Sequence, residues 1–203
     1  MNSIDRLTAL FTKFPGIGMR QARRFVYFFL TVRKDFVDEL IEALSVLKSE
    51  VHQCNRCYRF FEYGSSSEKS CSLCVGKEQK PMLIVVEKDV DLENIKKGEM
   101  YEGYYFVLGG LLTPLQKESF VRVRELLERV KNDAEKGILK EVVIALGVNP
   151  NGNYTTLHLK KLLSPIAENH ALSITTLGRG MSTGTELEYS DAETLKHAFE
   201  NRK

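Results

Sequence analysis

Two pairs of cysteines constrain this chain more than any other feature. Cys54 and Cys57 form one C-x2-C pair, and Cys71 and Cys74 form a second pair after 13 intervening residues. Each pair can give two thiolates to one ion, and two pairs complete the tetrahedron that zinc prefers. The spacing therefore predicts a small zinc finger at residues 53–79 with one structural Zn²⁺ per chain.

Three other interpretations of the cysteines fit the sequence less well. Disulfides need an oxidising compartment, and the N-terminus MNSIDRLTALF has no secretory pattern. A redox dithiol needs one pair instead of two, and an iron–sulfur cluster stays open as an alternative. Because four thiolates leave no open position for water, a zinc ion here is expected to be structural and not catalytic. His52 lies close by and is expected to be a surface residue.

Residues 1–52 are expected to form a helical region. Apolar residues recur at helical spacing, which predicts helices at residues 3–12, 19–31 and 36–50. Residues 1–34 carry seven Lys or Arg side chains and one acid, whereas the whole chain has a net charge of only +2. Such a local excess of positive charge suits a phosphate backbone, and the alternative is a solvated helix face.

The segment FPGIGMRQARR places a tight turn directly before a basic helix. Gly16 and Gly18 can adopt backbone conformations that other residues avoid, and the turn would direct amide groups outward at the positive end of the helix. Arg20 and Arg24 share one helix face, beside Arg23. The residues predicted to contact DNA phosphates are Lys13, Gly16, Gly18, Arg20, Arg23 and Arg24. The alternative is a plain turn in which glycine ends a helix.

This helix, Pro-Gly-Ile-Gly turn and helix resemble the helix-hairpin-helix motif of DNA repair proteins. Contacts of that motif go to backbone phosphates, so the binding it implies is not sequence-specific.

From Pro81 onward the pattern changes to strands that alternate with helices. Continuous apolar runs, typical of buried parallel strands, predict strands at residues 82–86, 104–108, 142–146 and 172–177. Helices are expected at residues 120–130, 155–168 and 191–201, and a short edge strand at residues 186–189. The alternation favours right-handed crossovers and a mostly parallel sheet, so the predicted fold class is α/β with a helical N-terminal region.

The succession of these parts resembles the RecR family of bacterial recombination-repair proteins. The resemblance covers nearly the whole chain, and the segments that carry it are FPGIGMRQA, the two cysteine pairs, VVEKDVDLENI, YYFVLGGLLTPL and GRGMSTGTELEYSDAETLKHAF. It implies that the α/β part is a Toprim domain. The regions it implies are a helix-hairpin-helix region (1–52), a four-cysteine zinc finger (53–79), a Toprim-like α/β domain (80–178) and a C-terminal assembly segment (179–203).

Toprim enzymes hold magnesium with a glutamate after the first strand and an Asp-x-Asp pair after a later strand. Glu87 occupies the first position, but Asn151-Gly152-Asn153 stands where RecR proteins commonly have Glu-Gly-Glu. Asp89 and Asp91 lie beside Glu87, on the wrong connection to complete the usual site. Neutral amides bind magnesium poorly, so we expect Glu87 to cap a strand end or to pair with a nearby arginine.

The resemblance implies a non-enzymatic, DNA-binding mediator of recombinational repair that acts with RecO and RecF to load recombinase at gapped DNA. It also implies a ring-shaped homotetramer, whose four patches would bind DNA together. Two alternatives stay open: a magnesium-dependent Toprim nuclease or primase, and a zinc-dependent protein-interaction module without DNA binding. No apolar run approaches the roughly 20 residues that span a membrane, so no membrane partner and a location in the bacterial cytoplasm are expected.

Overall fold

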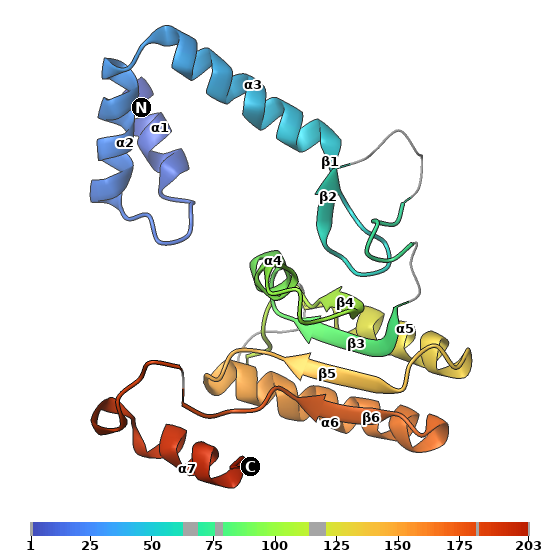
Figure 1. Cartoon of the computed structure of the whole chain (residues 1–203). Coiled ribbons are helices and arrows are strands. Elements are labelled where there is room, and N and C mark those ends of the chain that lie inside the picture. The colour runs from blue at the N-terminus through green and yellow to red at the C-terminus, as the bar shows by residue number, and fades with distance from the viewer. Residues whose placement is uncertain (1, 63–68, 76–78, 114–120, 182, 203) are drawn as a thin grey trace. The chain divides into compact units, whose positions relative to one another are not determined.

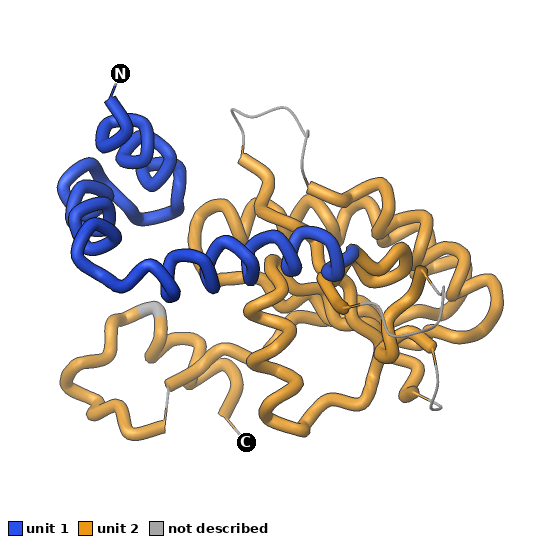
Figure 2. Tube along the Cα trace, turned by 90° about the horizontal axis from the view of Figure 1, so that it is seen from above, with its two compact units in different colours: residues 1–52 blue, residues 53–203 orange. Residues whose placement is uncertain are grey.

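The computed structural model describes residues 2–62, 69–75, 79–113, 121–181 and 183–202 (Figure 1). Contacts within the chain divide it into two compact units, Met1–His52 and Gln53–Lys203 (Figure 2).

The first unit consists of three helices, α1 (Ser3–Phe11), α2 (Met19–Thr31) and α3 (Lys34–Glu50). The side chain of Asn2 caps α1 by accepting a hydrogen bond from the amide of Asp5. Helices α1 and α2 pack against each other, and the side chains of Thr8, Ala22 and Val26 are buried. The expectation of a helical N-terminal region is confirmed.

Helix α3 buries none of its residues, although apolar side chains follow its 3.6-residue period. The exposed fractions of Phe36, Ile41, Leu44 and Leu47 lie between 44% and 59%. A helix of this length with an exposed apolar face gains little stability from its own chain, because most helical stability in proteins comes from packing. This face is therefore available to another surface.

The second unit is built around a parallel sheet of four strands in the order β4-β3-β5-β6. Its strands are β3 (Lys80–Val86), β4 (Gly103–Val107), β5 (Glu141–Ala145) and β6 (Ser173–Thr176). All four strands expected from the apolar runs are present. At the end of β3, Val86 pairs with Val107 of β4 on one side and with Ala145 of β5 on the other. Glu87 follows β3 directly and therefore lies at the side of the sheet where the carboxyl ends of the parallel strands meet.

Successive side chains of β3 point to opposite faces of the sheet and enter two separate cores. Leu83 and Val85 pack with helices α5 (Val123–Glu135) and α6 (Pro150–His170), whereas Ile84 and Val86 pack on the other face with α4 (Asp89–Lys97). Figure 1 shows this three-layer arrangement of helices on both faces of the sheet. A strand covered on both faces explains why its sequence is continuously apolar.

Helix α4 was not expected from the sequence. Only Leu92 of its nine residues is buried, so its apolar periodicity is weak. Its first turn is instead stabilised by Asp91, whose carboxylate accepts a hydrogen bond from the Lys88 amide at 2.9 Å. Also unexpected is a small two-stranded sheet formed by β1 (Val51–Gln53) and β2 (Phe60–Glu62). Strands of three residues are too short to show a period.

The prediction of a short edge strand at residues 186–189 is wrong. That segment contains a single 3₁₀ turn, η1 (Leu187–Tyr189), in which the amide of Tyr189 donates to the carbonyl of Glu186. Because the backbone satisfies its own hydrogen bonds in this turn, it needs no neighbouring strand. Helix α7 (Ala192–Glu200) follows, and Asp191 caps it by accepting a hydrogen bond from the amide of Thr194.

Two other helices differ from expectation at their ends. Helix α6 begins at Pro150, five residues before the expected start, and continues through Pro165 to His170. Proline suits the first position of a helix, where its missing N–H has no partner to lose. Helix α5 begins at Val123, and residue 120, the expected start, lies outside the described residues.

The connection from β5 to α6 requires glycine at position 152. The side chain of Asn149 caps α6 by accepting a hydrogen bond from the Gly152 amide at 2.9 Å. A Cβ atom added to Gly152 would lie 1.9 Å from the carbonyl oxygen of Gly147. The loop and the first turn of the helix are therefore packed backbone against backbone.

Replacing Gly152 with alanine is expected to destabilise the second unit by about 2–3 kcal/mol, because the helix must move away from the loop. This change corresponds to a fall in melting temperature of about 5 °C or more, measured by circular dichroism. The matched control is Gly178→Ala, since a Cβ atom there meets nothing within 4 Å. Equal melting temperatures for the two variants would contradict the prediction.

Candidate functional sites

The four cysteine side chains meet at one buried site. The Sγ atoms of Cys54 and Cys74 are 3.8 Å apart, those of Cys57 and Cys71 are 3.5 Å apart, and all four lie within 4.8 Å of one another. All four cysteines are buried, and none forms a disulfide. The two pairs therefore face a common centre at distances too long for covalent bonds between the sulfurs.

This geometry can hold a metal ion. A tetrahedron with metal–sulfur distances near 2.3 Å separates the sulfurs by about 3.8 Å, which is close to the observed spacing. The amides of Arg56 and Cys71 each donate to the Sγ atom of Cys54 at 3.4 Å, which favours the thiolate form that binds metal. Hydrogen bonding between the thiols, chiefly that of Cys54 and Cys57, lowers the pKa of Cys54 and raises the pKa of Cys57.

The backbone of the first cysteine pair is fixed against the sheet. Tyr58 adopts a left-handed conformation (φ 62°), and its amide donates to the carbonyl of Cys54 at 3.0 Å. Its ring packs edge-on against Phe106 with centroids 5.3 Å apart. The Val107 amide of β4 donates to the carbonyl of Cys57 at 2.8 Å. A non-glycine residue holds this conformation only where surrounding contacts determine it, and both contacts here come from the sheet.

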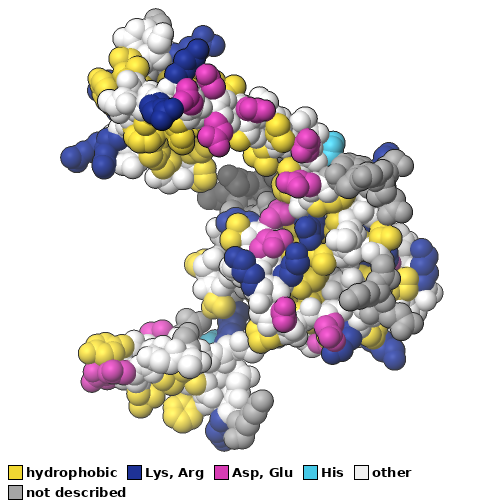
Figure 3. Space-filling view, turned by 45° about the horizontal axis from the view of Figure 1, so that its top comes forward, with side chains coloured by type: hydrophobic (Ala, Val, Ile, Leu, Met, Phe, Trp, Pro, Cys, Tyr) yellow, Lys and Arg dark blue, Asp and Glu magenta, His cyan; other side chains and the backbone are white. Residues whose placement is uncertain are grey.

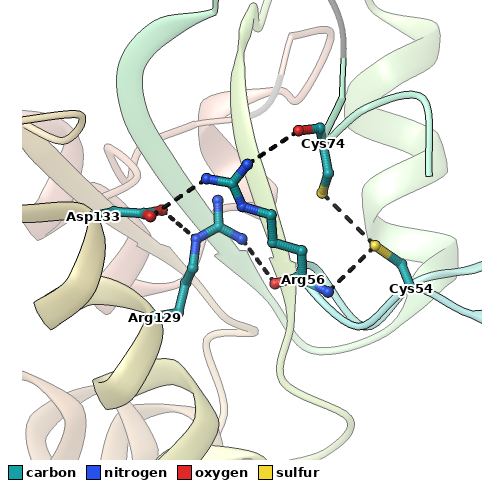
Figure 4. Close-up of polar contacts among 5 residues, drawn as sticks. All are labelled: Cys54, Arg56, Cys74, Arg129 and Asp133. Atoms are coloured by element: carbon teal, nitrogen blue, oxygen red, sulfur yellow. Dashed lines mark hydrogen bonds and ion pairs between the residues drawn. The ribbon is translucent and has the colours of Figure 1, made fainter. Parts of the chain in front are cut away.

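Three charged residues near the cysteines were missed by the sequence analysis. Arg56, within the first pair, lies next to Arg129 and Asp133 of α5 (Figure 4). Arg129 and Asp133 are both buried, which is rare for charged side chains. Their spacing of four residues on a helix is the one available sequence signal, and it is common on solvated helices as well.

The turn before α2 has one glycine in a left-handed conformation. Gly16 has φ of 77°, whereas Gly18 caps α2 with φ of −83° and ψ of 171°, which other residues also adopt. Gly16 therefore uses the conformational freedom of glycine, and Gly18 does not. A Cβ atom would meet nothing within 4 Å at either position, so this side of the turn is open. The amides of the first helical turn have no carbonyl partner within the helix.

The basic side chains around this turn are exposed. Lys13, Arg20, Arg23 and Arg24 all lie at the surface, and Arg24 contacts only Gln21 in the hydrogen bonds recorded for the described residues. No acidic residue occurs between Arg6 and Lys34, so nothing within the segment neutralises this charge. Figure 3 shows Lys and Arg side chains beside hydrophobic ones on the surface of the helical unit.

Glu87 lies at the end of β3, and its carboxylate pairs with the Nζ atom of Lys88 at 2.8 Å, so its partner is a lysine and not the expected arginine. The two nearby acids form hydrogen bonds with backbone amides. The carboxylate of Asp89 accepts a hydrogen bond from the amide of Phe60 at 2.8 Å, and that of Asp91 accepts one from the amide of Lys88. From β5 to the first turn of α6, residues 142–153 contain no acid that could join Glu87.

Amides take the places of the later carboxylate pair. Asn151 and Asn153 stand at those two positions, in the first turn of α6. Asn153 accepts a hydrogen bond from Arg179 at 2.9 Å, and Asn149, just before the helix, caps it. Such contacts suit a neutral, structural helix start more than a magnesium site.

Within the described ranges, none of the helices is both long enough and apolar enough to cross a membrane.

Comparison with known proteins identifies two parts of the chain and its relatives. Residues 82–177 match the family described as Toprim domain, and residues 180–203 match the family described as RecR, C-terminal. Recombination protein RecR of Chloroherpeton thalassium is 34% identical over 99% of this chain and 96% of its own. The RecR proteins of Chlorobium chlorochromatii and Prochlorococcus marinus are 34% and 33% identical, each over 98% of this chain and over 96% and 94% of their own.

With a cysteine cluster, a parallel α/β sheet and this similarity along nearly all of its length, the chain belongs to the RecR family of recombination proteins.

Proposed function

We propose that this protein is a non-enzymatic, DNA-binding mediator of recombinational repair in the bacterial cytoplasm, which works with RecO and RecF to load recombinase at gapped DNA. Family membership supports the role in recombination, and RecO and RecF are proposed from the family alone. The observation that carries the DNA-binding part is the open Gly16 turn followed by the acid-free arginine helix.

The turn and helix have the properties of a phosphate-binding site. Unpaired amides at the start of α2 and the positive end of its dipole favour an anion. Arg20, Arg23 and Arg24 extend the positive charge along the same helix, where they can reach neighbouring phosphates. Contacts of this kind are independent of base sequence, and their strength falls steeply as salt rises. Lys13 would add a further contact from the other side of the turn.

The metal is proposed to be zinc, held by four thiolates in a purely structural role. Zinc prefers this ligand set and geometry, and the closed site leaves no position for a reacting water. Among the described residues, the buried cysteine cluster has few apolar neighbours, Phe61 and Leu73. Such a small core needs the metal to fold, and structural zinc contributes on the order of 10 kcal/mol.

Assembly into a ring tetramer is proposed through two separate apolar surfaces. One is the exposed face of α3 in the helix-hairpin-helix region (1–52). The other lies in the C-terminal assembly segment (179–203), where Leu187, Tyr189 and Phe199 are 66%, 78% and 66% exposed. Large exposed apolar patches mark interaction sites, and two distinct self-associating surfaces on one chain can close a ring.

The Toprim-like part (80–178) is proposed to serve as a scaffold and not as a nuclease or primase. Phosphoryl-transfer chemistry needs carboxylates that converge on magnesium. Here Glu87 pairs with Lys88, and residues 142–153 offer no acid; of the amides there, Asn149 caps α6 and Asn153 accepts a hydrogen bond from Arg179. The chemistry of this sheet edge therefore supports the recruiting role over the catalytic alternative.

Metal analysis of the purified, reduced protein is expected to give about one zinc per chain, since the four ligands converge on one centre. Removing the zinc with a strong chelator is expected to unfold residues 53–79 and to lower the melting temperature. Cys71→Ser should reduce the zinc content below about half an ion per chain. Iron with inorganic sulfide, or a full set of intact disulfides, would contradict the zinc assignment.

The variant Arg20→Glu/Arg24→Glu is expected to weaken DNA binding by at least about tenfold at low salt, because two phosphate contacts are replaced by repulsion. Fluorescence anisotropy with a labelled gapped duplex measures the change. The matched control is Arg124→Glu/Lys131→Glu, which reverses two exposed charges on α5. Unchanged binding by the α2 variant would favour a protein-interaction module without a DNA role.

The variant Ile41→Glu/Leu44→Glu is expected to reduce the mass of the assembly from that of a tetramer to a smaller species, because charge is placed on the apolar face of α3. Light scattering coupled to size exclusion measures the mass. Glu39→Lys/Glu42→Lys changes two exposed side chains elsewhere on the same helix and should leave the tetramer intact. A tetramer that persists in the first variant would exclude α3 as an interface.

A further inference from the structure

Arg56 links the two cysteine pairs to each other. Its amide donates to the Sγ atom of Cys54 at 3.4 Å, and its Nη1 atom donates to the carbonyl of Cys74 at 3.2 Å (Figure 4). Its Nη2 atom reaches a carboxylate oxygen of Asp133 at 3.4 Å. One residue therefore contacts the first pair, the second pair and helix α5.

Arg129 holds the same backbone from α5. Its Nη1 atom donates to the carbonyl of Arg56 at 2.8 Å, and its Nε atom bonds the other oxygen of Asp133. The ring of Tyr104 lies 5.7 Å from the guanidinium carbon of Arg56 and 5.6 Å from that of Arg129. Two guanidinium groups thus share one carboxylate and one aromatic ring; that of Arg129 contacts the backbone of the first cysteine pair, and that of Arg56 contacts the backbone of the second.

The charges of this cluster complement those of a loaded metal site. A zinc ion with four thiolates carries a net charge of −2, because the ligands contribute −4. Arg56, Arg129 and Asp133 together carry +1. A net cation beside the site stabilises the thiolates, whereas a lone buried arginine would pay a large desolvation cost. The carboxylate of Asp133 offsets part of that cost and fixes the direction of both guanidinium groups.

We propose that Arg56, Arg129 and Asp133 are positioning residues of the metal centre, which hold the two cysteine pairs at metal-binding distance and slow the loss of zinc. The inference rests on the proposed zinc site. Outer contacts of this kind orient metal ligands, and their removal typically costs 10–100-fold in metal affinity. Helix α5 thereby becomes part of the metal centre although it supplies no ligand.

The experiment compares zinc affinity in Arg56→Met and in the unaltered protein, by competition with a chromogenic chelator at a temperature where both are folded. Methionine keeps the apolar length of the side chain and removes the donors and the charge. Zinc affinity is expected to fall about 10–100-fold. Arg56 suits this test because its side chain is 34% exposed, so its loss leaves no large cavity.

The control is Arg124→Met, which likewise removes a guanidinium group from an ion pair, here with Glu128 at the exposed surface of α5. Arg124 and Glu128 are 87% and 61% exposed and contact no cysteine. Its zinc affinity should equal that of the unaltered protein. Melting temperatures recorded for both variants separate general destabilisation from a specific effect, because a merely structural role would lower the melting temperature and leave zinc affinity unchanged.

A second variant, Arg56→Lys, keeps the charge but cannot contact Cys74 and Asp133 together through a planar fork. We expect an intermediate loss of zinc affinity, and this variant decides the question if Arg56→Met does not fold. Equal affinity in both Arg56 variants and the unaltered protein would overturn the inference and leave the zinc site standing. An unaltered protein that binds no zinc would instead overturn the proposed metal, and with it this inference.

Discussion

The burial of β3 on both of its faces is the constraint on which the rest of the second unit depends. Its side chains alternate between two cores, so helices must cover both sides of the sheet. Its hydrogen bonds to β4 and β5 align the carboxyl ends of the three strands, where Glu87 and the β5–α6 connection lie. In β4, the amide of Val107 donates a hydrogen bond to the carbonyl of Cys57, so the cysteine site is positioned by the sheet as well.

The two candidate sites use different physics. At the cysteines, burial, convergent thiols and a surrounding set of charged hydrogen bonds favour a rigid, closed metal centre. At the turn before α2, the opposite features matter, because open space, unpaired amides and exposed guanidinium groups leave the surface ready for a large anion. Under the proposed function, the cysteine site is structural and the turn before α2 is the surface that binds DNA.

Much of the fold and of the sites could be predicted from local patterns. The four sheet strands, the helical region and the cysteine cluster follow from apolar runs, helical spacing and the two C-x2-C pairs. Helix α4 could not be predicted, since one buried residue leaves almost no periodicity. The segment around Leu187 was misjudged as a strand, because a strand also requires a neighbour, which local sequence does not reveal. The conformations of Gly16 and Gly18 likewise differ although both are glycine.

The sequence by itself determined the ligand types, the acid-free basic segment and the lack of an acid at residues 142–153, because these depend on residue identity and short spacing alone. Only the tertiary structure decided that Arg56 meets Arg129 and Asp133, that α3 keeps its apolar face exposed, and that Glu87 pairs with Lys88. Contacts between residues more than 70 positions apart follow from how strands and helices stack, and no short-range pattern records that stacking.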